Sequence, residues 1–136
     1  MNSQQLLVAD LMTMDPVTIA VDASIEDAVR LCRANVVSGL PVTDDDGELV
    51  GVISQTDLVS IQDSAIGRLI RSNRSGLRVG EVMSSPAITV PMTASLREAA
   101  RVMRESHIHR VVALDDDGRP VGVLSSSDFV ALYADG

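Results

Sequence analysis

Aromatic side chains are almost absent from this sequence of 136 residues. Phe129 and Tyr133 are the only two, and there is no tryptophan. The core must therefore consist of aliphatic residues and methionine, and the aromatic platforms on which single-stranded nucleic acid stacks are missing. Lysine is absent too, so that 19 acidic residues face 11 arginines and the net charge is −8. Such a chain lacks the basic face that sequence-independent binding of DNA or RNA requires.

Cysteine occurs once, as Cys32. A single thiol excludes an intramolecular disulfide and a thiolate metal cluster. It falls at an apolar position of a predicted helix, which favours a small buried hydrophobe over a nucleophile. Residues 1–10 contain no basic stretch followed by an apolar run, and no apolar run reaches membrane-spanning length. We therefore expect a cytoplasmic protein.

The sequence contains an internal repeat. Sliding it by 71 positions aligns residues 11–58 with 82–129 without a gap, and 16 of the 48 aligned positions are identical. Self-similarity at a fixed period indicates repeated structural units. We predict a first repeat over residues 7–62, a linker over residues 63–76 and a second repeat over residues 77–134.

Each repeat contains one clearly amphipathic helix. Ser24 is a suitable N-cap in the first repeat, and Ser95 with Glu98 has the capping-box pattern in the second. Apolar residues follow at helical spacing and predict a buried stripe of Ile25, Ala28, Val29 and Cys32 in the first repeat, and of Leu96, Ala99, Ala100 and Met103 in the second. The charged residues on the opposite face indicate exposure to solvent.

Strand patterns surround each helix. They cover residues 17–21, 39–43 and 49–53 in the first repeat, and residues 87–90, 110–114 and 120–124 in the second. An Asp-Asp-Asp-Gly sequence separates the last two strands of each repeat, and Asp-Gly is a strong hairpin signal because glycine accepts positive φ. Gly51 and Gly122 lie inside the last strands, which indicates the close approach of another group. A final helix begins near Ser54 or Ser125.

The predicted order in each repeat is β-α-β-β-α, and the predicted fold class is α/β (α+β). A unit of about 50 residues is too small to bury a stable core alone. We therefore expect the two repeats to pack sheet against sheet with pseudo-two-fold symmetry.

Both repeats resemble the cystathionine-β-synthase (CBS) domain family. The first repeat carries the resemblance in Asp10-Leu11-Met12-Thr13, Pro16, Thr18, Gly39-Leu40-Pro41-Val42, Asp46-Gly47 and Val50-Gly51-Val52-Ile53-Ser54-x-x-Asp57. The second carries it in Val82-Met83-Ser84, Pro86, Thr89, His109-Arg110-Val111, Asp117-Gly118 and Val121-Gly122-Val123-Leu124-Ser125-x-x-Asp128. The resemblance covers residues 8–132, and two such domains in tandem form a Bateman module.

The resemblance implies a regulatory module that binds an adenosine-containing ligand (AMP, ADP, ATP or S-adenosylmethionine) in one or both of two clefts between the repeats. It implies that ligand state is transmitted by conformational change, to an unidentified regulated protein, and that two modules form a homodimer. The sequence has no nucleophile–base pair, metal cluster or Walker-type loop. We therefore expect no enzymatic activity, no catalytic residue and no metal.

The resemblance also assigns ligand-binding residues. One cleft would combine Thr18, Val37, Ser38, Gly39, Leu40 and Pro41 with Ser125, Ser127 and Asp128. The other would combine Thr89, Ile108 and His109 with Ser54, Thr56 and Asp57, and His109 and Arg110 would face phosphates. The aspartates would accept hydrogen bonds from the ribose diol, as acidic residues do in dinucleotide folds. The hydroxyl groups lie at predicted helix N-termini, which favour anions.

Each assignment has a structural alternative. Ser54 with Asp57, and Ser125 with Asp128, also fit a capping box, while Thr18 and Thr89 are β-branched residues of the kind that strands prefer. His107 and His109 would share one face of a strand, but no third metal ligand lies nearby. The Asp triplets lack the ligand spacing of a calcium-binding loop and fit solvated turns.

Two other functions are compatible with the same fold. One is a ligand-free adaptor or dimerisation domain that acts only through protein contacts, although polar residues in both clefts disfavour it. The other is nucleic-acid binding, which the acidity and the missing aromatics disfavour.

Overall fold

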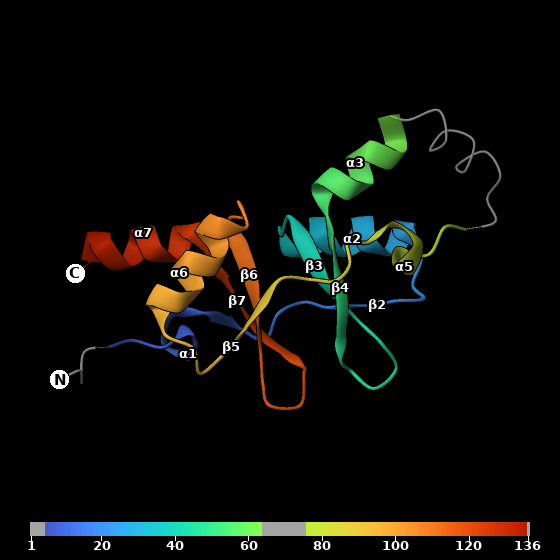
Figure 1. The fold of residues 1–136 in the computed structure, drawn as a ribbon. Helices are drawn as coiled ribbons and strands as arrows, with labels where there is room; N and C mark the ends of the chain where they lie inside the picture. Colours follow the sequence, from blue (N-terminus) through green and yellow to red (C-terminus); the bar gives the residue numbers. More distant parts are fainter. Residues whose placement is uncertain (1–4, 64–75, 136) are drawn as a thin grey trace. The chain divides into compact units, whose positions relative to one another are not determined.

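The computed structural model describes residues 5–63 and 76–135 of the chain (Figure 1). The chain forms two compact units, here called the central unit (Val17–Ala87) and the terminal unit (Met1–Pro16 with Ile88–Gly136). Nearly all of the predicted linker, 63–76, falls outside the described residues. None of the described helices has the length and apolar character of a membrane-spanning segment.

The central unit is a three-stranded sheet with helices packed on it. Its strands, in spatial order, are β2 (Ile19–Ala20), β3 (Gly39–Thr43) and β4 (Leu49–Ser54). Its helices are α2 (Ile25–Asn35), α3 (Gln55–Asp63) and α5 (Val79–Val82). β2 runs parallel to β3, and β3 runs antiparallel to β4. Helix α2 contacts β3, and α3 and α5 contact β4.

The terminal unit is a four-stranded sheet that includes a strand from the N-terminal region. The strands, in spatial order, are β1 (Thr13–Met14), β7 (Pro120–Ser125), β6 (Arg110–Leu114) and β5 (Thr89–Pro91). The helices are α1 (Val8–Leu11), α6 (Leu96–Glu105) and α7 (Ser126–Asp135). Helix α6 contacts β6, while α7 and α1 contact β7 (Figure 1).

The predicted order β-α-β-β-α is therefore confirmed in both repeats, as β2-α2-β3-β4-α3 and β5-α6-β6-β7-α7. The mixed α+β class is confirmed as well. The first strand of each repeat differs from its prediction: β2 is shorter and covers only residues 19–20, and β5 begins later and extends to Pro91. Packing of sheet against sheet stays a prediction.

The compact units differ from the division of the sequence into repeats, because the repeats exchange their opening segments. Thr13 pairs antiparallel with Val123, and Val8 N–H donates to the Ala94 carbonyl at 2.8 Å. The same contacts recur 71 residues away in the central unit. There Ser84 pairs antiparallel with Val52, and Val79 N–H donates to the Ala23 carbonyl at 2.8 Å. Each opening segment thus pairs with the last strand of the other repeat, the first as strand β1 and the second through a single isolated bridge.

The exchanged segments explain the two glycines inside the last strands. A Cβ atom added to Gly122 would lie 2.7 Å from Met12 Cγ and still closer to the sulfur. A Cβ added to Gly51 would lie 2.6 Å from Met83 Sδ and 2.8 Å from the carbonyl oxygen of Ser84. The close approach predicted from the sequence is therefore that of a methionine from the opening segment of the other repeat.

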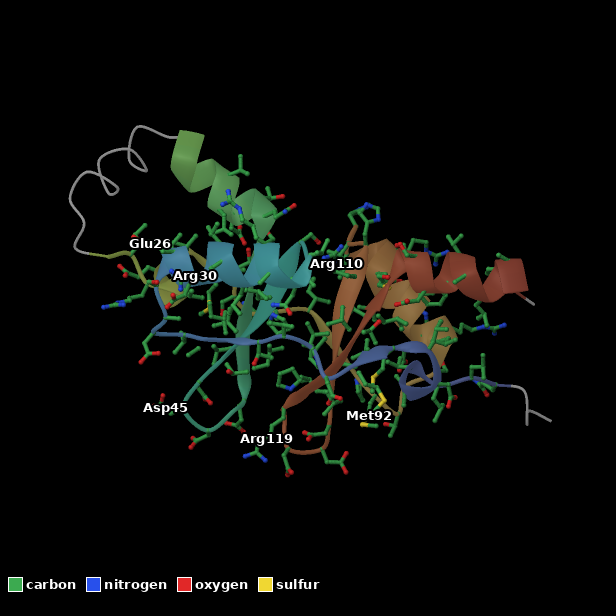
Figure 2. The ribbon with its side chains drawn as sticks, turned by 180° about the vertical axis from the view of Figure 1, so that it is seen from behind. Glu26, Arg30, Asp45, Met92, Arg110 and Arg119 are labelled. Atoms are coloured by element: carbon green, nitrogen blue, oxygen red, sulfur yellow. The ribbon has the colours of Figure 1, made fainter. Side chains whose placement is uncertain are left out.

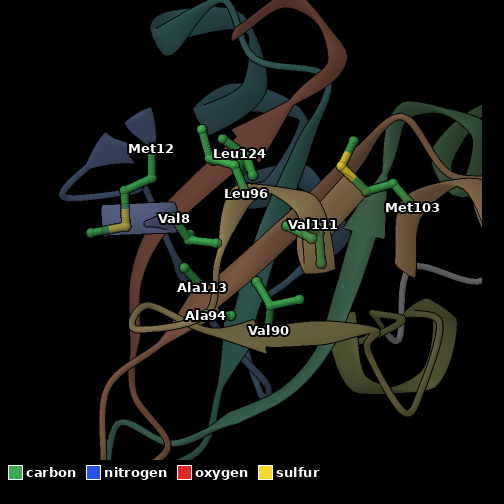
Figure 3. Close-up of a cluster of buried hydrophobic side chains, with 10 residues drawn as sticks. Val8, Met12, Val90, Ala94, Leu96, Met103, Val111, Ala113 and Leu124 are labelled. Carbon is green, nitrogen blue, oxygen red and sulfur yellow. The ribbon is translucent and has the colours of Figure 1, made fainter. Parts of the chain in front are cut away.

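The core of the terminal unit joins residues from both ends of the chain (Figure 3). Val8 and Met12 from the opening segment pack with Val111 and Leu124 of the sheet and Met103 of α6. Burying a large aliphatic side chain contributes about 1.5–3 kcal/mol. The opening segment is consequently part of this core and not an extension of the first repeat.

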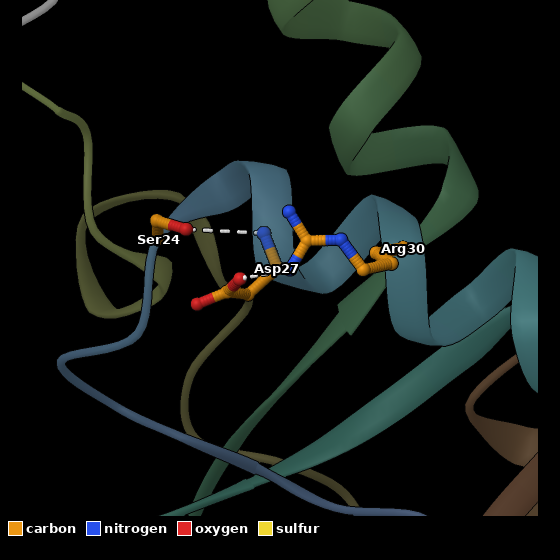
Figure 4. Close-up of polar contacts among 3 residues, drawn as sticks. All are labelled: Ser24, Asp27 and Arg30. Carbon is orange, nitrogen blue, oxygen red and sulfur yellow. Dashed lines mark hydrogen bonds and ion pairs between the residues drawn. The ribbon is translucent and has the colours of Figure 1, made fainter.

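The N-caps of helices α2 and α6 are the serines that the sequence predicts. Ser24 Oγ accepts the Asp27 N–H at 3.0 Å, and the Asp27 carboxylate pairs with Arg30 at 2.8 Å (Figure 4). Ser95 Oγ accepts the Glu98 N–H at 3.1 Å in the same way.

The predicted buried stripes are confirmed for Ala28, Cys32, Leu96, Ala99 and Met103, and half-buried Ile25 and Val29 pack against the core. The prediction is wrong for Ala100, which is exposed at the edge of its stripe.

The Asp-Asp-Asp-Gly segments form the predicted hairpin turns. Gly47 and Gly118 have φ of 83° and 81°, which L-residues rarely adopt. Asp44 Oδ1 accepts the N–H groups of Asp46 and Glu48 at 2.9 and 3.0 Å, and Asp115 does the same in the second repeat. Figure 2 shows Asp45 at the tip of the first turn. These aspartates therefore stabilise turns.

Candidate functional site

A polar corner joins β4 to α3 in the central unit. The Asp57 carboxylate accepts the Ser54 N–H at 2.9 Å and the Ser54 hydroxyl at 3.0 Å, both through Oδ2. Ser54 Oγ in turn accepts the Asp57 N–H at 3.2 Å. This is the capping box that the sequence offered as the structural alternative, and it fixes both side chains at the N-terminus of α3.

The second repeat builds the same corner between β7 and α7. Asp128 Oδ2 accepts the Ser125 N–H at 2.8 Å and the Ser125 hydroxyl at 3.1 Å. Both side chains are half-buried, whereas Ser127 is exposed. Thr56 occupies the position of Ser127 in the first repeat and is exposed too.

Capping leaves part of each corner available for a ligand. Among the described residues, Oδ1 of Asp57 and Oδ1 of Asp128 make no hydrogen bond. A carboxylate offers about four lone-pair sites, so the unused oxygen can still accept from a hydroxyl group. Thr56 and Ser127 add hydroxyl groups in the first turn of each helix, where backbone N–H groups favour an anion. The capping role and a ligand role are therefore compatible.

The predicted segment 37–41 lies beside the corner of its own repeat. Gly39 is paired with Ser54 across the β3–β4 ladder, and the Ser38 carbonyl accepts the Gln55 N–H at 2.8 Å. A Cβ at position 39 would lie 3.2 Å from the Ile53 carbonyl oxygen, so little room exists there for a side chain. Leu40 and Pro41 are buried and Val37 is half-buried, which leaves Ser38 and the backbone as the polar groups.

The corresponding segment of the second repeat carries His109 and Arg110. Arg110 is paired with Ser125 across the β6–β7 ladder, and the His109 carbonyl accepts the Ser126 N–H at 2.8 Å. Figure 2 shows the Arg110 side chain at the start of β6. Both side chains are exposed. His107 and His109 precede β6, which begins at Arg110, so they do not share a face of a strand. His107 adopts φ of 56° just after α6.

The two threonines take similar but unequal positions. Thr18 immediately precedes β2, while Thr89 is the first residue of β5 and is paired with Val112. Both are half-buried. Their contact with a ligand stays a prediction, as does the combination of residues from both repeats into two clefts.

A pocket of about 470 Å³ opens in the terminal unit between the end of α6 and the start of α7. It contains two of the predicted residues, Ile108 and His109, together with residues that the sequence did not assign to a site. These are Ala100, Met103, Arg104, His107, Ser126 and Phe129. The helical spacing of Ala100, Met103 and Arg104 is visible in the sequence, but it indicates only an apolar stripe and a solvated charged face.

Cys32 and the acidic cluster of the first hairpin turn do not form a catalytic or metal site. Burial raises the pKa of the Cys32 thiol, so this group stays protonated at neutral pH and is a poor nucleophile. The carboxylates of Asp44, Asp46 and Glu48 lie within 4.8 Å of one another. However, Asp44 already caps the turn, and Arg119 replaces Glu48 in the second repeat.

Relatives of this chain share its tandem organisation. The family model of the CBS domain matches residues 8–64 and again residues 79–135. A CBS domain-containing protein of Dictyostelium discoideum is 31% identical over 134 residues, which cover 94% of this chain and 91% of that protein. Inosine-5′-monophosphate dehydrogenase of Mycobacterium tuberculosis is 34% identical over 120 residues, but these cover only 21% of the enzyme.

Solved structures match the fold along nearly the whole chain. CBSX2, whose crystal structure is a complex with AMP, is 30% identical with a TM-score of 0.81, covering 95% of this chain and 96% of that one. The CBS domain pair of protein MJ0100, in complex with 5′-methylthioadenosine and S-adenosyl-L-methionine, is 25% identical with a TM-score of 0.78, covering 96% and 97%. Two family matches in tandem and this structural likeness together establish that the chain belongs to the CBS domain family, as a pair of CBS domains.

Proposed function

We propose that this chain is a regulatory module that binds an adenosine-containing ligand through the Ser-x-(Ser/Thr)-Asp corners of its CBS domains. The observation that carries the proposal is its likeness to CBSX2 and to the MJ0100 domain pair, whose structures hold AMP and S-adenosyl-L-methionine. AMP, ADP, ATP and S-adenosylmethionine are the candidate ligands, and ligand binding changes the conformation of the module or its choice of partner.

The chemistry of the corners supports this proposal. Asp57 and Asp128 each retain a carboxylate oxygen for a ribose diol, in a position that the capping box holds in place. A charged acceptor is well suited to two neighbouring hydroxyl donors. Ser38 and the backbone of segment 37–41 lie beside the first corner and offer hydrogen bonds to the edge of a base.

We propose further that the chain has no catalytic activity of its own. The inosine-5′-monophosphate dehydrogenase of Mycobacterium tuberculosis matches this chain over only 21% of its own length. In each corner the serine hydroxyl donates to an aspartate oxygen that also accepts the serine N–H, so the carboxylate serves the helix cap.

A thermal shift experiment with AMP, ADP, ATP and S-adenosylmethionine tests the proposal. A ligand present at 100 times its dissociation constant stabilises the native state by about 2.7 kcal/mol. We expect at least one of the four to raise the melting temperature in a saturable manner. No shift with any of them would contradict the proposal and favour the adaptor function.

We also propose that the chain forms a homodimer through its helices. Val130 and Tyr133 are 67% and 84% exposed, and their spacing of three residues places them on one face of α7. Val59 of α3 is 52% exposed. An apolar helix face of this kind is typical of protein contacts.

Light scattering of the purified protein tests this second proposal. We expect the mass of a dimer for the wild type and of a monomer for Val130→Arg, since a charge on the apolar face disfavours the contact. The matched control is Arg101→Ala on the exposed face of α6, which should leave the mass unchanged. A monomeric wild type would contradict the proposal.

A further inference from the structure

The methionine side chains of this protein differ widely in their access to solvent. Of those that the structure describes, Met14 is 65% exposed, Met83 and Met92 are half-buried, and Met12 and Met103 are buried. A peroxide converts the thioether of methionine to a sulfoxide, which is polar where the original side chain is apolar. We expect oxidation to begin at Met14 and to reach the buried pair last, with an effect that depends on what each sulfur contacts.

Met83 combines partial exposure with a sulfur that is seated in the fold. A Cβ atom built on Gly51 of β4 would lie 2.6 Å from Met83 Sδ and 3.1 Å from Met83 Cγ, so the side chain fills the notch that the glycine leaves. The carbonyl oxygen of Ser84 lies 2.8 Å from the same point. A sulfoxide oxygen accepts hydrogen bonds and can form none with a carbonyl oxygen. The notch therefore suits the thioether and not its oxidised form.

Few polar contacts hold the second opening segment on β4. Val52 N–H donates to the Ser84 carbonyl at 3.1 Å, and Ser84 N–H donates to the Val52 carbonyl at 2.9 Å, which together form the isolated bridge. The exposed Ser85 hydroxyl donates to the Val50 carbonyl at 3.0 Å. Met83 immediately precedes this bridge, so a change in its packing acts directly on the edge of β4.

The same contact is better protected in the terminal unit. Met12, the equivalent of Met83, is only 9% exposed. The segment that carries it pairs with β7 at two positions, Thr13 with Val123 and Met14 with Gly122. The two repeats thus share a methionine-on-glycine contact, and the one in the central unit is the more open to an oxidant.

We infer that Met83 is a site of reversible oxidation, which loosens the second opening segment from β4. Hydrogen peroxide transfers one oxygen atom to the Met83 sulfur: the O–O bond breaks, the sulfur loses two electrons to form the sulfoxide, and water is released. The sulfoxide leaves the notch over Gly51, and the bridge between Ser84 and Val52 opens. β4 continues into α3 (Figure 1), so the loosened edge lies two residues from Ser54. A methionine sulfoxide reductase with a thiol reductant restores the thioether.

The test treats the full chain with hydrogen peroxide and maps the oxidised methionines by mass spectrometry. We expect Met83 to react more slowly than Met14 and faster than Met12. Amide NMR follows hydrogen exchange at Val52, which should become about tenfold faster in the oxidised protein, because the hydrogen bonds of the bridge are lost. Treatment with the reductase should restore the slow exchange.

Two variants assign the effect to one sulfur atom. Met83→Leu has a similar volume and no sulfur, so Val52 should keep its slow exchange after peroxide treatment. Met14→Leu is the matched control, since it removes the most exposed of the described methionine side chains and should respond to peroxide as the wild type does. A melting curve of each variant verifies that it is folded.

Three results would overturn the inference. Oxidation of Met83 no faster than that of Met12 would exclude it as a preferred site. Unchanged exchange at Val52 after Met83 is oxidised would show that the opening segment stays in place. A peroxide effect that persists in Met83→Leu would assign the response to another residue. The first two results come from the wild type alone, and none involves a nucleotide, so failure of AMP to bind would leave the inference unaffected.

Discussion

At the scale of single residues, the aspartates of the two corners have a capping role, and the proposed function gives them a ligand-binding role as well. Each carboxylate closes a capping box through one oxygen, and the other oxygen makes no hydrogen bond among the described residues. Replacing either aspartate should therefore lower both the free energy of unfolding and the affinity for the ligand. The two effects can be measured in separate experiments.

Asp128→Ala should lower the free energy of unfolding by about 1 kcal/mol, because the cap of α7 is lost. It should also weaken AMP binding by about 1–3 kcal/mol, because the ribose loses a charged acceptor. Ser95→Ala is the matched control: it removes the cap of α6 and should cost similar stability without changing the affinity. Urea unfolding and calorimetric titration give the two quantities. An affinity unchanged in Asp128→Ala would identify this residue as a cap only.

Val36 is a second residue whose effect on the free energy of unfolding can be tested. It is 91% exposed and adopts φ of 54° and ψ of 49° at the end of α2, a conformation unfavourable for a β-branched residue. Val36→Gly should raise the free energy of unfolding by roughly 0.5–1 kcal/mol, since the relief of strain exceeds the added chain entropy. His107→Gly, at the equivalent position, should gain less because histidine tolerates positive φ better. A less stable Val36→Gly protein would show that valine makes a favourable contact there.

At the scale of elements, the contact between each opening segment and the sheet of the other repeat depends on a glycine. Gly122→Ala should lower the free energy of unfolding by about 1–3 kcal/mol, because the new methyl group overlaps Met12. Gly51→Ala should cost at least as much, because its methyl group meets both Met83 and a backbone carbonyl.

Second-site changes distinguish these two cases. Met12→Ala should partly rescue Gly122→Ala, since the three atoms nearest to the added Cβ all belong to the Met12 side chain. Met83→Ala should not rescue Gly51→Ala, since the Ser84 carbonyl oxygen remains 2.8 Å from the added atom. Urea unfolding of the single and double variants measures both coupling energies. Equal rescue in the two repeats would contradict this description of the contacts.

The sequence predicts the local elements well and the exchange of segments not at all. Ser24, Ser95 and the Asp-Gly turns act on neighbouring backbone groups, so the helix caps and hairpin turns that they form can be predicted from a few residues. Met12 and Gly122 are far apart in the chain, and the repeat places an equivalent pair, Met83 and Gly51, in the other copy. A methionine could therefore oppose the glycine of either repeat, and only the tertiary structure decides between them.

The candidate site, too, could be predicted only where the contacts are between residues close in sequence. The capping alternative for Asp57 and Asp128 was visible in the sequence because it spans three residues. The pocket beside His109 was not, because Arg104, Ser126 and Phe129 come from elements whose sequence patterns indicate only core or solvent. The left-handed residues Val36 and His107 also gave no signal, since neither is the glycine or asparagine that usually ends a helix in this way.

At the scale of the whole molecule, the exchanged segments predict which part of the chain depends on its N-terminal region. Deleting residues 1–14 removes Val8 and Met12 from the core of the terminal unit, and burial of each of these side chains contributes about 1.5–3 kcal/mol. We expect faster hydrogen exchange in β5, β6 and β7 and little change in β2, β3 and β4. Loss of protection mainly in β2–β4 would show that the segment stabilises its own repeat.

The central claim is that the chain binds an adenosine-containing ligand at its two corners. Titration of the isotope-labelled protein with AMP, ADP, ATP and S-adenosylmethionine, followed by amide NMR, tests it most directly. We predict that at least one of these ligands produces saturable shifts concentrated in Ser54–Asp57, in Ser125–Asp128, or in both. The absence of saturable shifts with all four, or shifts confined to other parts of the chain, would contradict the claim.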